Sequence, residues 1–269
     1  MTLSTRIVPK MIEPVLTYYE LGDAVKAFSS SRHGGVSEGN YGRFNINEYC
    51  GDAPEAISEN RNALSVSLKI DVDHIIMPHQ THGISLREIG PEFFSLPEKV
   101  KQMLLEGVDG LLTSMSGVCI GVSTADCIPV LLYDEEHHAV CAVHSGWRGT
   151  VQYIVLKAVA EMRQAYCSNP QKLKAVIGPG ISLENFEVGT EVYEQFASNG
   201  YDMSRVARKY EKWHIDLPEC CRIQLIGAGV SPHNIQMADI CTYSHADDYF
   251  SARRLGTLSG RIFTAIMLK

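Results

Sequence analysis

Residues 118–149 read VCIGVSTADCIPVLLYDEEHHAVCAVHSGWRG, and this stretch decides the fold of the chain. It contains apolar runs rich in Val and Ile at 118–122, 128–133 and 139–143. Runs of this length, interrupted by polar segments, are typical of buried strands. The polar segment 134–138 separates the second run from the third, so we expect two core strands around a turn.

Reactive side chains stand at the ends of these predicted strands. Cys127 comes directly before the second strand, and His144 directly follows the third. Polar residues at the strand ends of a rigid core are a common way to build a site. Their separation is enough for a strand, a turn and a strand back. We therefore expect a hairpin that carries both Cys127 and His144.

Size and composition exclude several classes of protein. The chain has 269 residues, 45% hydrophobic and 20% charged, which is ordinary for a globular protein. Its net charge of −7 argues against binding nucleic acid or anionic lipid. No stretch approaches the roughly 18 consecutive apolar residues of a membrane span. The sequence shows no repeat and no linker, so we expect 1–269 to form a single domain.

The eight cysteines help to place the protein in the cell. The start of the chain does not resemble a signal peptide, so we expect reduced thiols in a cytoplasmic protein. There is no CxxC pair, which argues against a structural zinc ribbon. Cys119 and Cys141 lie inside apolar runs and are expected to be buried. Cys127 differs because it follows Asp126 at the start of a strand.

Helices and strands alternate along the rest of the chain. Helices are predicted to begin at Pro54, Leu96, Thr190 and Leu217 and after a cap at Thr150, and strands at 75–77, 108–113, 175–177 and 262–268. The helix capped by Thr150 would offer free N–H groups beside the predicted site. Residues 199–213 are expected to be an irregular surface excursion or lid. Many connections are hairpin-like, which favours an α+β fold over a doubly wound parallel sheet.

Three residues at separate strand ends are candidate metal ligands: His82, Cys127 and His144. Cysteine thiolate and imidazole together suit a borderline-soft ion, zinc first and copper second. Three protein ligands leave a fourth position open, which is typical of a catalytic zinc. The alternative is that Cys127 and His144 form a nucleophile pair without a metal.

Several arginines lie beside motif-like segments, namely Arg32, Arg61, Arg148, Arg253 and Arg254. Arginines that converge on a metal site would indicate an anionic substrate group such as phosphate. Each one alone is equally well explained as a surface or salt-bridge residue. The Gly-rich segment beside Arg32 could cradle a phosphate or form a structural hairpin loop.

These motifs occur together in one known family. They are Ser31–Ser37, Asn45, Asn60–Arg61, Gln80–Gly83, Asp109–Gly110, Ala125–Val130, His144–Gly149, Gly178–Ile181, Cys241–Thr242 and Phe250–Arg254. From about Ala27 to Leu268, the chain resembles the YfiH family, once labelled multicopper polyphenol oxidases (laccases) and now purine nucleoside phosphorylases. Departures are small, such as Ser145 in place of the usual alanine and Ala252 in place of tyrosine.

The resemblance implies a cytoplasmic enzyme with a layered α/β/β/α sandwich and mixed sheets. It implies a catalytic zinc, with copper possible, on His82, Cys127 and His144. Family members are described as cleaving adenosine, inosine, guanosine and S-methyl-5′-thioadenosine with phosphate, and as deaminating adenosine. The competing hypotheses are a copper-dependent polyphenol oxidase and a metal-free Cys–His hydrolase.

Six residues within or beside these motifs are predicted to bind the substrate: Arg32, Asn45, Arg61, Gln80, Arg148 and Arg253. The expected partners are purine nucleosides and phosphate. No motif indicates the preferred nucleoside or the oligomeric state.

Overall fold

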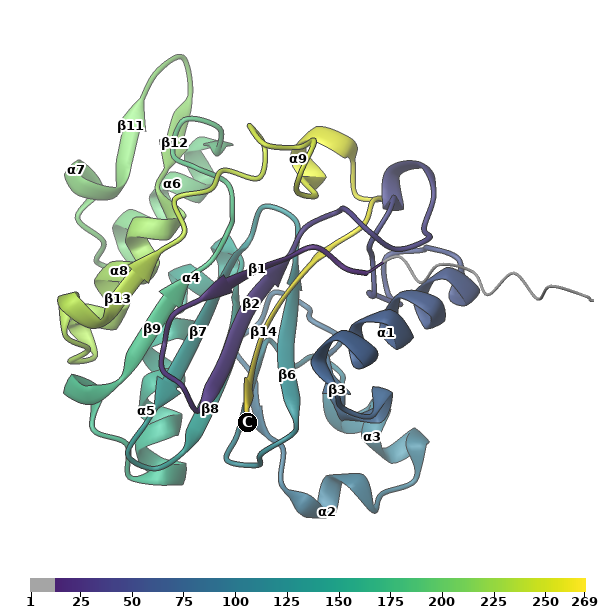
Figure 1. Cartoon of the computed structure of the whole chain (residues 1–269). Helices are drawn as coiled ribbons and strands as arrows, with labels where there is room; N and C mark the ends of the chain where they lie inside the picture. The colour runs from purple at the N-terminus through teal and green to yellow at the C-terminus, as the bar shows by residue number, and fades with distance from the viewer. Residues whose placement is uncertain (1–12) are drawn as a thin grey trace, which may run out of the picture.

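Two stacked β-sheets form the middle of the protein in a computed structural model that describes residues 13–269 (Figure 1). One sheet has the strand order β1 (Leu16–Tyr19), β2 (Val25–Ser30), β14 (Ile262–Leu268), β6 (Cys119–Thr124) and β3 (Ile75–Ile76). The other has the order β13 (Ile235–Met237), β9 (Lys174–Ile177), β7 (Ile128–Asp134), β8 (Ala139–Ser145), β5 (Gly110–Thr113) and β4 (Leu86–Glu88). The pairs β3–β6, β4–β5 and β9–β13 are parallel among antiparallel neighbours, so both sheets are mixed.

The central strands are apolar throughout because both of their faces are covered. Ile120 of β6 packs with Leu131 of β7 in the core between the sheets. Its neighbour Cys119 points the other way, into the core beneath α1 (Pro54–Leu68). Cys119 and Cys141 are fully buried, which confirms their prediction. Each buried aliphatic side chain contributes about 1.5–3 kcal/mol, so this doubly covered centre makes a rigid base for a site.

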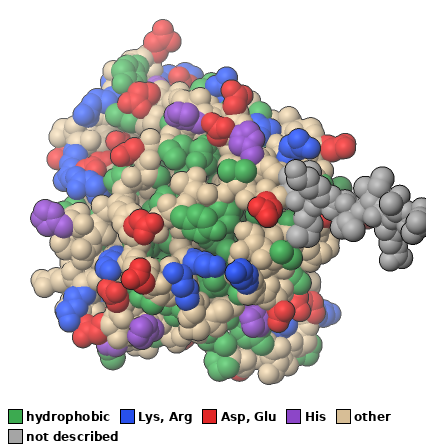
Figure 2. Space-filling view, in the orientation of Figure 1, with side chains coloured by type: hydrophobic (Ala, Val, Ile, Leu, Met, Phe, Trp, Pro, Cys, Tyr) green, Lys and Arg blue, Asp and Glu red, His purple; other side chains and the backbone are tan. Residues whose placement is uncertain are grey.

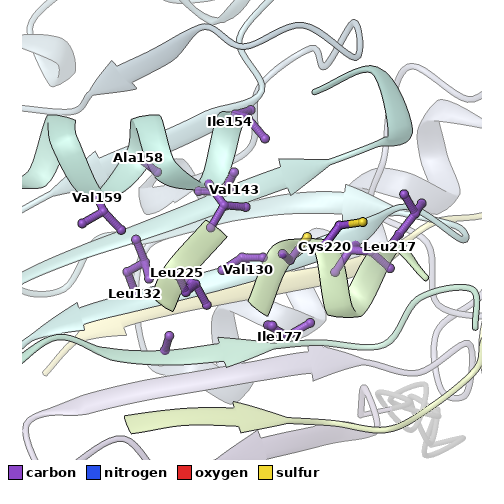
Figure 3. Packing of buried hydrophobic residues seen from close by; sticks show 14 of the residues in the cluster. Val130, Leu132, Val143, Ile154, Ala158, Val159, Ile177, Leu217, Cys220 and Leu225 are labelled. Atoms are coloured by element: carbon purple, nitrogen blue, oxygen red, sulfur yellow. The ribbon is translucent and has the colours of Figure 1, made fainter. Parts of the chain in front are cut away.

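Helices cover the outer face of each sheet (Figure 1). α1 lies on the first sheet, and α5 (Ile154–Tyr166) with α8 (Leu217–Gly227) lies on the second. Figure 3 shows Val130 of β7 beside Leu225 of α8, and Val143 of β8 beside Ala158 of α5. The order helix, sheet, sheet, helix confirms the predicted α+β class and layered sandwich. The single domain over 1–269 stays a prediction at its start, since residues 1–12 lie outside the described residues.

Shorter elements surround this sandwich. They are α2 (Pro91–Phe94), α3 (Glu98–Leu105), α4 (Trp147–Val151), α6 (Thr190–Ser198), α7 (Met203–Val206), α9 (Ala252–Leu255) and a small sheet of β10 (Glu187–Val188), β12 (Trp213–Ile215) and β11 (Ala207–Lys209). Basic and acidic side chains are intermingled on the face in Figure 2, around a group of hydrophobic side chains. No helix within residues 13–269 is long and apolar enough to cross a membrane.

The sequence predicted an irregular segment at 199–213. In the structure, this segment contains α7 and most of the β11–β12 hairpin. β11 pairs antiparallel with β12, and β12 pairs with β10. Trp213 stacks on Tyr193 of α6, with 3.8 Å between ring centroids. Cross-strand pairing and this aromatic contact order a stretch whose polarity alone suggested a loop.

The prediction that Thr150 caps a helix was also wrong. The first helical segment, α4, begins at Trp147, and Gly146 is its N-cap. The Thr150 hydroxyl lies inside the helix and donates to the Gly146 carbonyl at 2.9 Å. The helix then breaks at Tyr153, whose φ of 61° is left-handed, before α5 begins.

The β7–β8 hairpin brings its two reactive ends together as predicted. Pro129 pairs with His144 and Ile128 with Ser145, so Cys127 lies directly beyond the paired region. The same edge of the fold receives the loop that follows β3 and the chain entering β14. These four segments build the site described next.

Candidate metal centre

Three side chains from separate loops and strand ends meet at this edge: His82 after β3, Cys127 between β6 and β7, and His144 on β8. One potential ligand atom from each lies within 4.8 Å of the other two. Within residues 13–269, no other group of three or more His, Cys, Asp or Glu side chains is gathered for a metal. The structure therefore brings together the three residues that the sequence singled out.

Asp109 holds two of these residues in place from behind. Its buried carboxylate accepts backbone N–H groups of Thr81 at 3.3 Å, His82 at 3.0 Å and Gly83 at 2.7 Å. It also accepts the Nδ1–H of His144 at 2.7 Å, so Nε2 is the nitrogen of His144 that can bind a metal. Burial would raise the pKa of Asp109, but the contacts with His144 and with the backbone donors lower it. The carboxylate is thus a charged anchor for the site.

Cys127 and His144 each favour the charged form of the other. Burial would raise the pKa of the Cys127 thiol, but the positive charge of His144 and contacts with both imidazoles lower it. Burial would lower the pKa of His144, but the Cys127 thiolate and Asp109 raise it. The thiolate is the form of cysteine that binds metals, so the electrostatics favour a ligand at this position.

Gly146 lets the three side chains approach each other. A Cβ atom there would lie 2.8 Å from His82 Cδ2, 3.2 Å from Cys127 Sγ and 3.5 Å from His144 Cε1. Atoms of His82, Cys127 and His144 thus surround the space that a side chain at position 146 would fill. With one thiolate and two imidazoles, the donor set fits a tetrahedral ion such as zinc that has one open position.

Asp126 points away from the three donors. Its φ is 91°, and its carboxylate accepts the Thr242 hydroxyl at 2.8 Å and the backbone N–H of Arg253 at 2.7 Å. Asp126 therefore ties the turn that carries Cys127 to the C-terminal part of the chain.

A cavity of about 240 Å³ opens over the three donors. Residues on its wall include Asn47, Tyr49, His79, Gln80, Thr124 and Arg261. No aspartate or glutamate within the described residues lines it. Arg261 therefore places a positive charge on a wall without carboxylates, where it can attract an anionic group.

Gln80 is the one residue of the predicted substrate-binding set that lines this cavity. Its side chain donates to the Ser123 carbonyl at 2.8 Å and accepts the Ser123 N–H at 2.7 Å. Asn45 is buried behind the wall, where its Oδ1 accepts the backbone N–H of Arg261 at 3.1 Å. Asn45 therefore does not line the cavity itself but holds the backbone of Arg261, which does.

The four predicted arginines bond elsewhere in the structure. Arg32 donates to the carbonyls of Gly42 and Ala246, and Arg61 to that of Ile75. The Arg148 guanidinium lies 4.3 Å from the ring centroid of Trp147, and Arg253 donates to the Glu187 carbonyl. None of the four lines the cavity over the metal centre.

Sequence reasoning did not assign roles to Asp109, Thr124 or Arg261. A usable signal existed for two of them. Asp109 is a carboxylate inside an apolar run at the start of a strand, where an unpartnered charge would be costly. Arg261 directly precedes the apolar run of β14, at the same kind of strand end that identified Cys127.

Comparison with known proteins shows the family of the chain. The family model described as "Multi-copper polyphenol oxidoreductase laccase" matches residues 26–269. The crystal structure of Bacillus licheniformis hypothetical protein YfiH superposes with a TM-score of 0.88 at 26% identity, covering 95% of this chain and 97% of that one. The chain belongs to the laccase-like YfiH family. The family resemblance inferred from the motifs is thus confirmed.

Two YfiH-family relatives have names that describe an activity. A "Purine nucleoside phosphorylase" of Bacteroides thetaiotaomicron is 45% identical over 247 residues, which cover 91% of this chain and 92% of that protein. "Adenosine deaminase RL5" of an unknown prokaryotic organism is 38% identical over 251 residues, which cover 92% and 95% respectively.

Proposed function

We propose that this YfiH-family protein is a zinc-dependent purine nucleoside phosphorylase that also deaminates adenosine. The observation that carries the proposal is the cluster of His82, Cys127 and His144 at a cavity without carboxylates. The names of the two relatives support the reaction class. The substrates would be adenosine, inosine, guanosine or S-methyl-5′-thioadenosine with phosphate.

His82, Cys127 and His144 would hold the zinc. When bound there, zinc would supply a Lewis acid for an oxygen or a leaving group of the reactants. Zinc is favoured over the copper of a multicopper oxidase because such an oxidase needs several ligand clusters. Residues 13–269 contain one cluster of this kind.

The side chains of the cavity have separate tasks in this proposal. Asp109 keeps His82 and His144 in place during the reaction. Tyr49 and His79 stack with 4.2 Å between ring centroids on the cavity wall, where they offer a flat face to a purine. Phosphorolysis breaks the C1′–N9 bond and forms a C1′–O bond to phosphate. The purine leaves with the electron pair and takes the proton of hydrogen phosphate.

The direct substrate-binding roles predicted for Arg32, Asn45, Arg61, Arg148 and Arg253 stay predictions. Gln80 would act by fixing Ser123 and the cavity wall. Cytoplasmic location also stays a prediction.

The test is release of free purine base, measured by chromatography with and without phosphate. We expect phosphate-dependent release that falls at least about 100-fold in His144→Ala, because an open-site zinc needs all three protein ligands. His233→Ala changes an exposed histidine outside the cavity and serves as the control. Base release that is equally fast without phosphate would contradict the phosphorylase proposal.

One observation favours a second candidate, a metal-free Cys–His hydrolase. Asp109, His144 and Cys127 follow one another in the order of an orienting acid, a base and a nucleophile. Hydrolysis that survives chelation, with Cys127 open to alkylation, would support this candidate. Activity that is lost on chelation and restored by zinc would reject it. Copper found by mass spectrometry as the resident metal would support the oxidase instead.

A further inference from the structure

Most polar side chains on the cavity wall already have partners inside the protein. Gln80 is bonded at both ends to the backbone of Ser123. Asn47 donates to the Ser123 hydroxyl and accepts a backbone N–H at 2.7 Å. His79 pairs with Glu106 through Nδ1 at 2.7 Å. These groups shape the cavity without requiring a ligand.

Thr124 is the exception among the buried groups of the wall. It is the last residue of β6, is 1% exposed and lines the cavity. Its hydroxyl has no hydrogen-bond partner within residues 13–269. A buried hydroxyl without a partner is costly, so its position on a cavity wall points to a bonding group on a ligand.

Arg261 is the second group on the wall with unused donors. Nη1 donates to the carbonyls of Ser259 at 2.6 Å and Gly260 at 3.0 Å, and Nη2 donates to that of Thr257 at 2.9 Å. These bonds fix the plane of the guanidinium but provide no negative charge. Arg261 forms no ion pair within residues 13–269, and its Nε–H and one Nη2–H have no partner there. Those two N–H groups form the fork that binds two oxygens of one anion.

Thr124 and Arg261 line the same cavity, and their backbones are neighbours where β6 ends and β14 begins. Thr124 of β6 pairs with Ile262 of β14, and Arg261 directly precedes Ile262. Cys127 follows three residues after Thr124 and lines the same cavity. An oxoanion at this position would therefore lie beside the metal centre. Because no carboxylate within the described residues lines the cavity, the Arg261 charge is not neutralised there.

We propose that Arg261 and Thr124 form an oxoanion subsite that binds inorganic phosphate beside His82, Cys127 and His144. The guanidinium fork takes two phosphate oxygens, and the Thr124 hydroxyl donates to a third. The role of this subsite in catalysis rests on the proposed phosphorylase function. Phosphate binding itself does not, so the two proposals can fail separately.

The experiment is calorimetric titration of the purified full chain with inorganic phosphate. We expect Arg261→Gln and Thr124→Val each to weaken phosphate binding about 10- to 100-fold, which is the range for hydrogen bonds to a charged group. Arg87→Gln removes the same charge from an exposed position on β4 and should bind as the wild type does. In assays, the KM for phosphate should rise in both cavity variants, while the KM for nucleoside should not.

Stability separates a binding role of Thr124 from a structural one. Thr124→Val removes a hydroxyl that has no partner, so its free energy of unfolding in urea should equal or exceed that of the wild type. A large loss of stability together with unchanged phosphate binding would overturn the role of Thr124.

Other results of the phosphate titration also support or overturn the subsite. Phosphate binding that is equal in Arg261→Gln and Arg87→Gln would overturn the subsite even if phosphorolysis occurs. Wild-type phosphate binding that Arg261→Gln abolishes would support the subsite even if no base is released. Binding of adenosine 5′-monophosphate but not of free phosphate would overturn the assignment to inorganic phosphate, since the anion would then belong to the substrate.

Discussion

Asp109 controls the position of two candidate ligands with one carboxylate. Three backbone N–H groups of the His82 loop and the imidazole of His144 all donate to it. A histidine ligand is oriented through its second nitrogen, and the partner of that nitrogen tunes metal affinity. The two histidines therefore share one support, although one follows β3 and the other lies on β8.

We predict that Asp109→Asn lowers zinc affinity about 10- to 100-fold, the usual effect of losing such a partner. It should also cost about 2 kcal/mol or more of stability, because a buried network loses its charge. Competition with a zinc chelator measures the first effect, and urea denaturation the second. Asp248→Asn is the matched control, since Asp248 also pairs with a histidine, His33, but does not line the cavity. Equal zinc affinity in the two variants would show that Asp109 is only structural.

Gly146→Ala tests how tightly the three donors are packed. A Cβ atom would lie 2.8 Å from the His82 ring, so the donors must separate to admit it. Such overpacking costs about 1–3 kcal/mol, and here it should be borne by the metal site as weaker zinc binding. Gly227→Ala meets no atom within 4 Å at the end of α8 and provides the control. An unchanged zinc content in Gly146→Ala would argue that the donors have room to spare.

The candidate metal ligands could be predicted from the sequence, whereas the contacts of the long arginine side chains could not. Cys127 and His144 are short, so their strand-end positions nearly determine where their donor atoms lie. An arginine side chain reaches several ångströms in many directions. Arg32 ends on the carbonyls of Gly42 and Ala246, and Ala246 is 214 residues away in sequence. Arg261 reaches the cavity because backbone carbonyls of its own loop hold it there.

The β7–β8 hairpin is the element that carries the site, and its far end is held by a buried carboxylate. Asp134 ends β7, and its carboxylate accepts the N–H groups of Glu136 at 3.0 Å and His137 at 3.2 Å. It also pairs with the His137 ring at 2.9 Å. The turn thus fixes the register that places Cys127 and His144 at the opposite end.

The turn should make hairpin stability depend on pH. Burial would raise the pKa of Asp134, but hydrogen bonds from neighbouring side chains and from the backbone lower it below the usual 3.8. A lowered pKa stabilises the fold above 3.8, and this contribution is lost as the pH falls through the folded-state value. The stability difference between wild type and Asp134→Asn should therefore be largest at pH 5–7 and shrink below about pH 3.5. Urea denaturation at several pH values measures it, and a constant difference would contradict the assignment.

The elements that the sequence misplaced depend on tertiary contacts. The break between α4 and α5 requires a left-handed Tyr153, which stacks on Tyr201 with 5.1 Å between ring centroids. The apolar periodicity continues through this break, so the pattern alone cannot reveal it. In the same way, β11 and β12 are too short to stand out without their partners.

On the scale of the whole molecule, the candidate metal centre joins the two sheets. His82 follows β3 of the first sheet, His144 lies on β8 of the second, and Cys127 lies in the connection between β6 and β7. A metal held by all three would close loops across the full sandwich. Binding free energy at such a site adds directly to the stability of the folded state.

Zinc should therefore stabilise the whole protein. With free zinc at 100 times its Kd, the free energy of unfolding should rise by about 2.7 kcal/mol. For a protein of this size, the melting temperature should rise by about 5–10 °C. Differential scanning calorimetry of the metal-free chain, before and after addition of zinc, measures the shift. His144→Ala should show little shift, because the two remaining ligands, His82 and Cys127, bind zinc weakly. An equal shift in His144→Ala would place the stabilising zinc elsewhere, and no shift in the wild type would favour the metal-free Cys–His hydrolase.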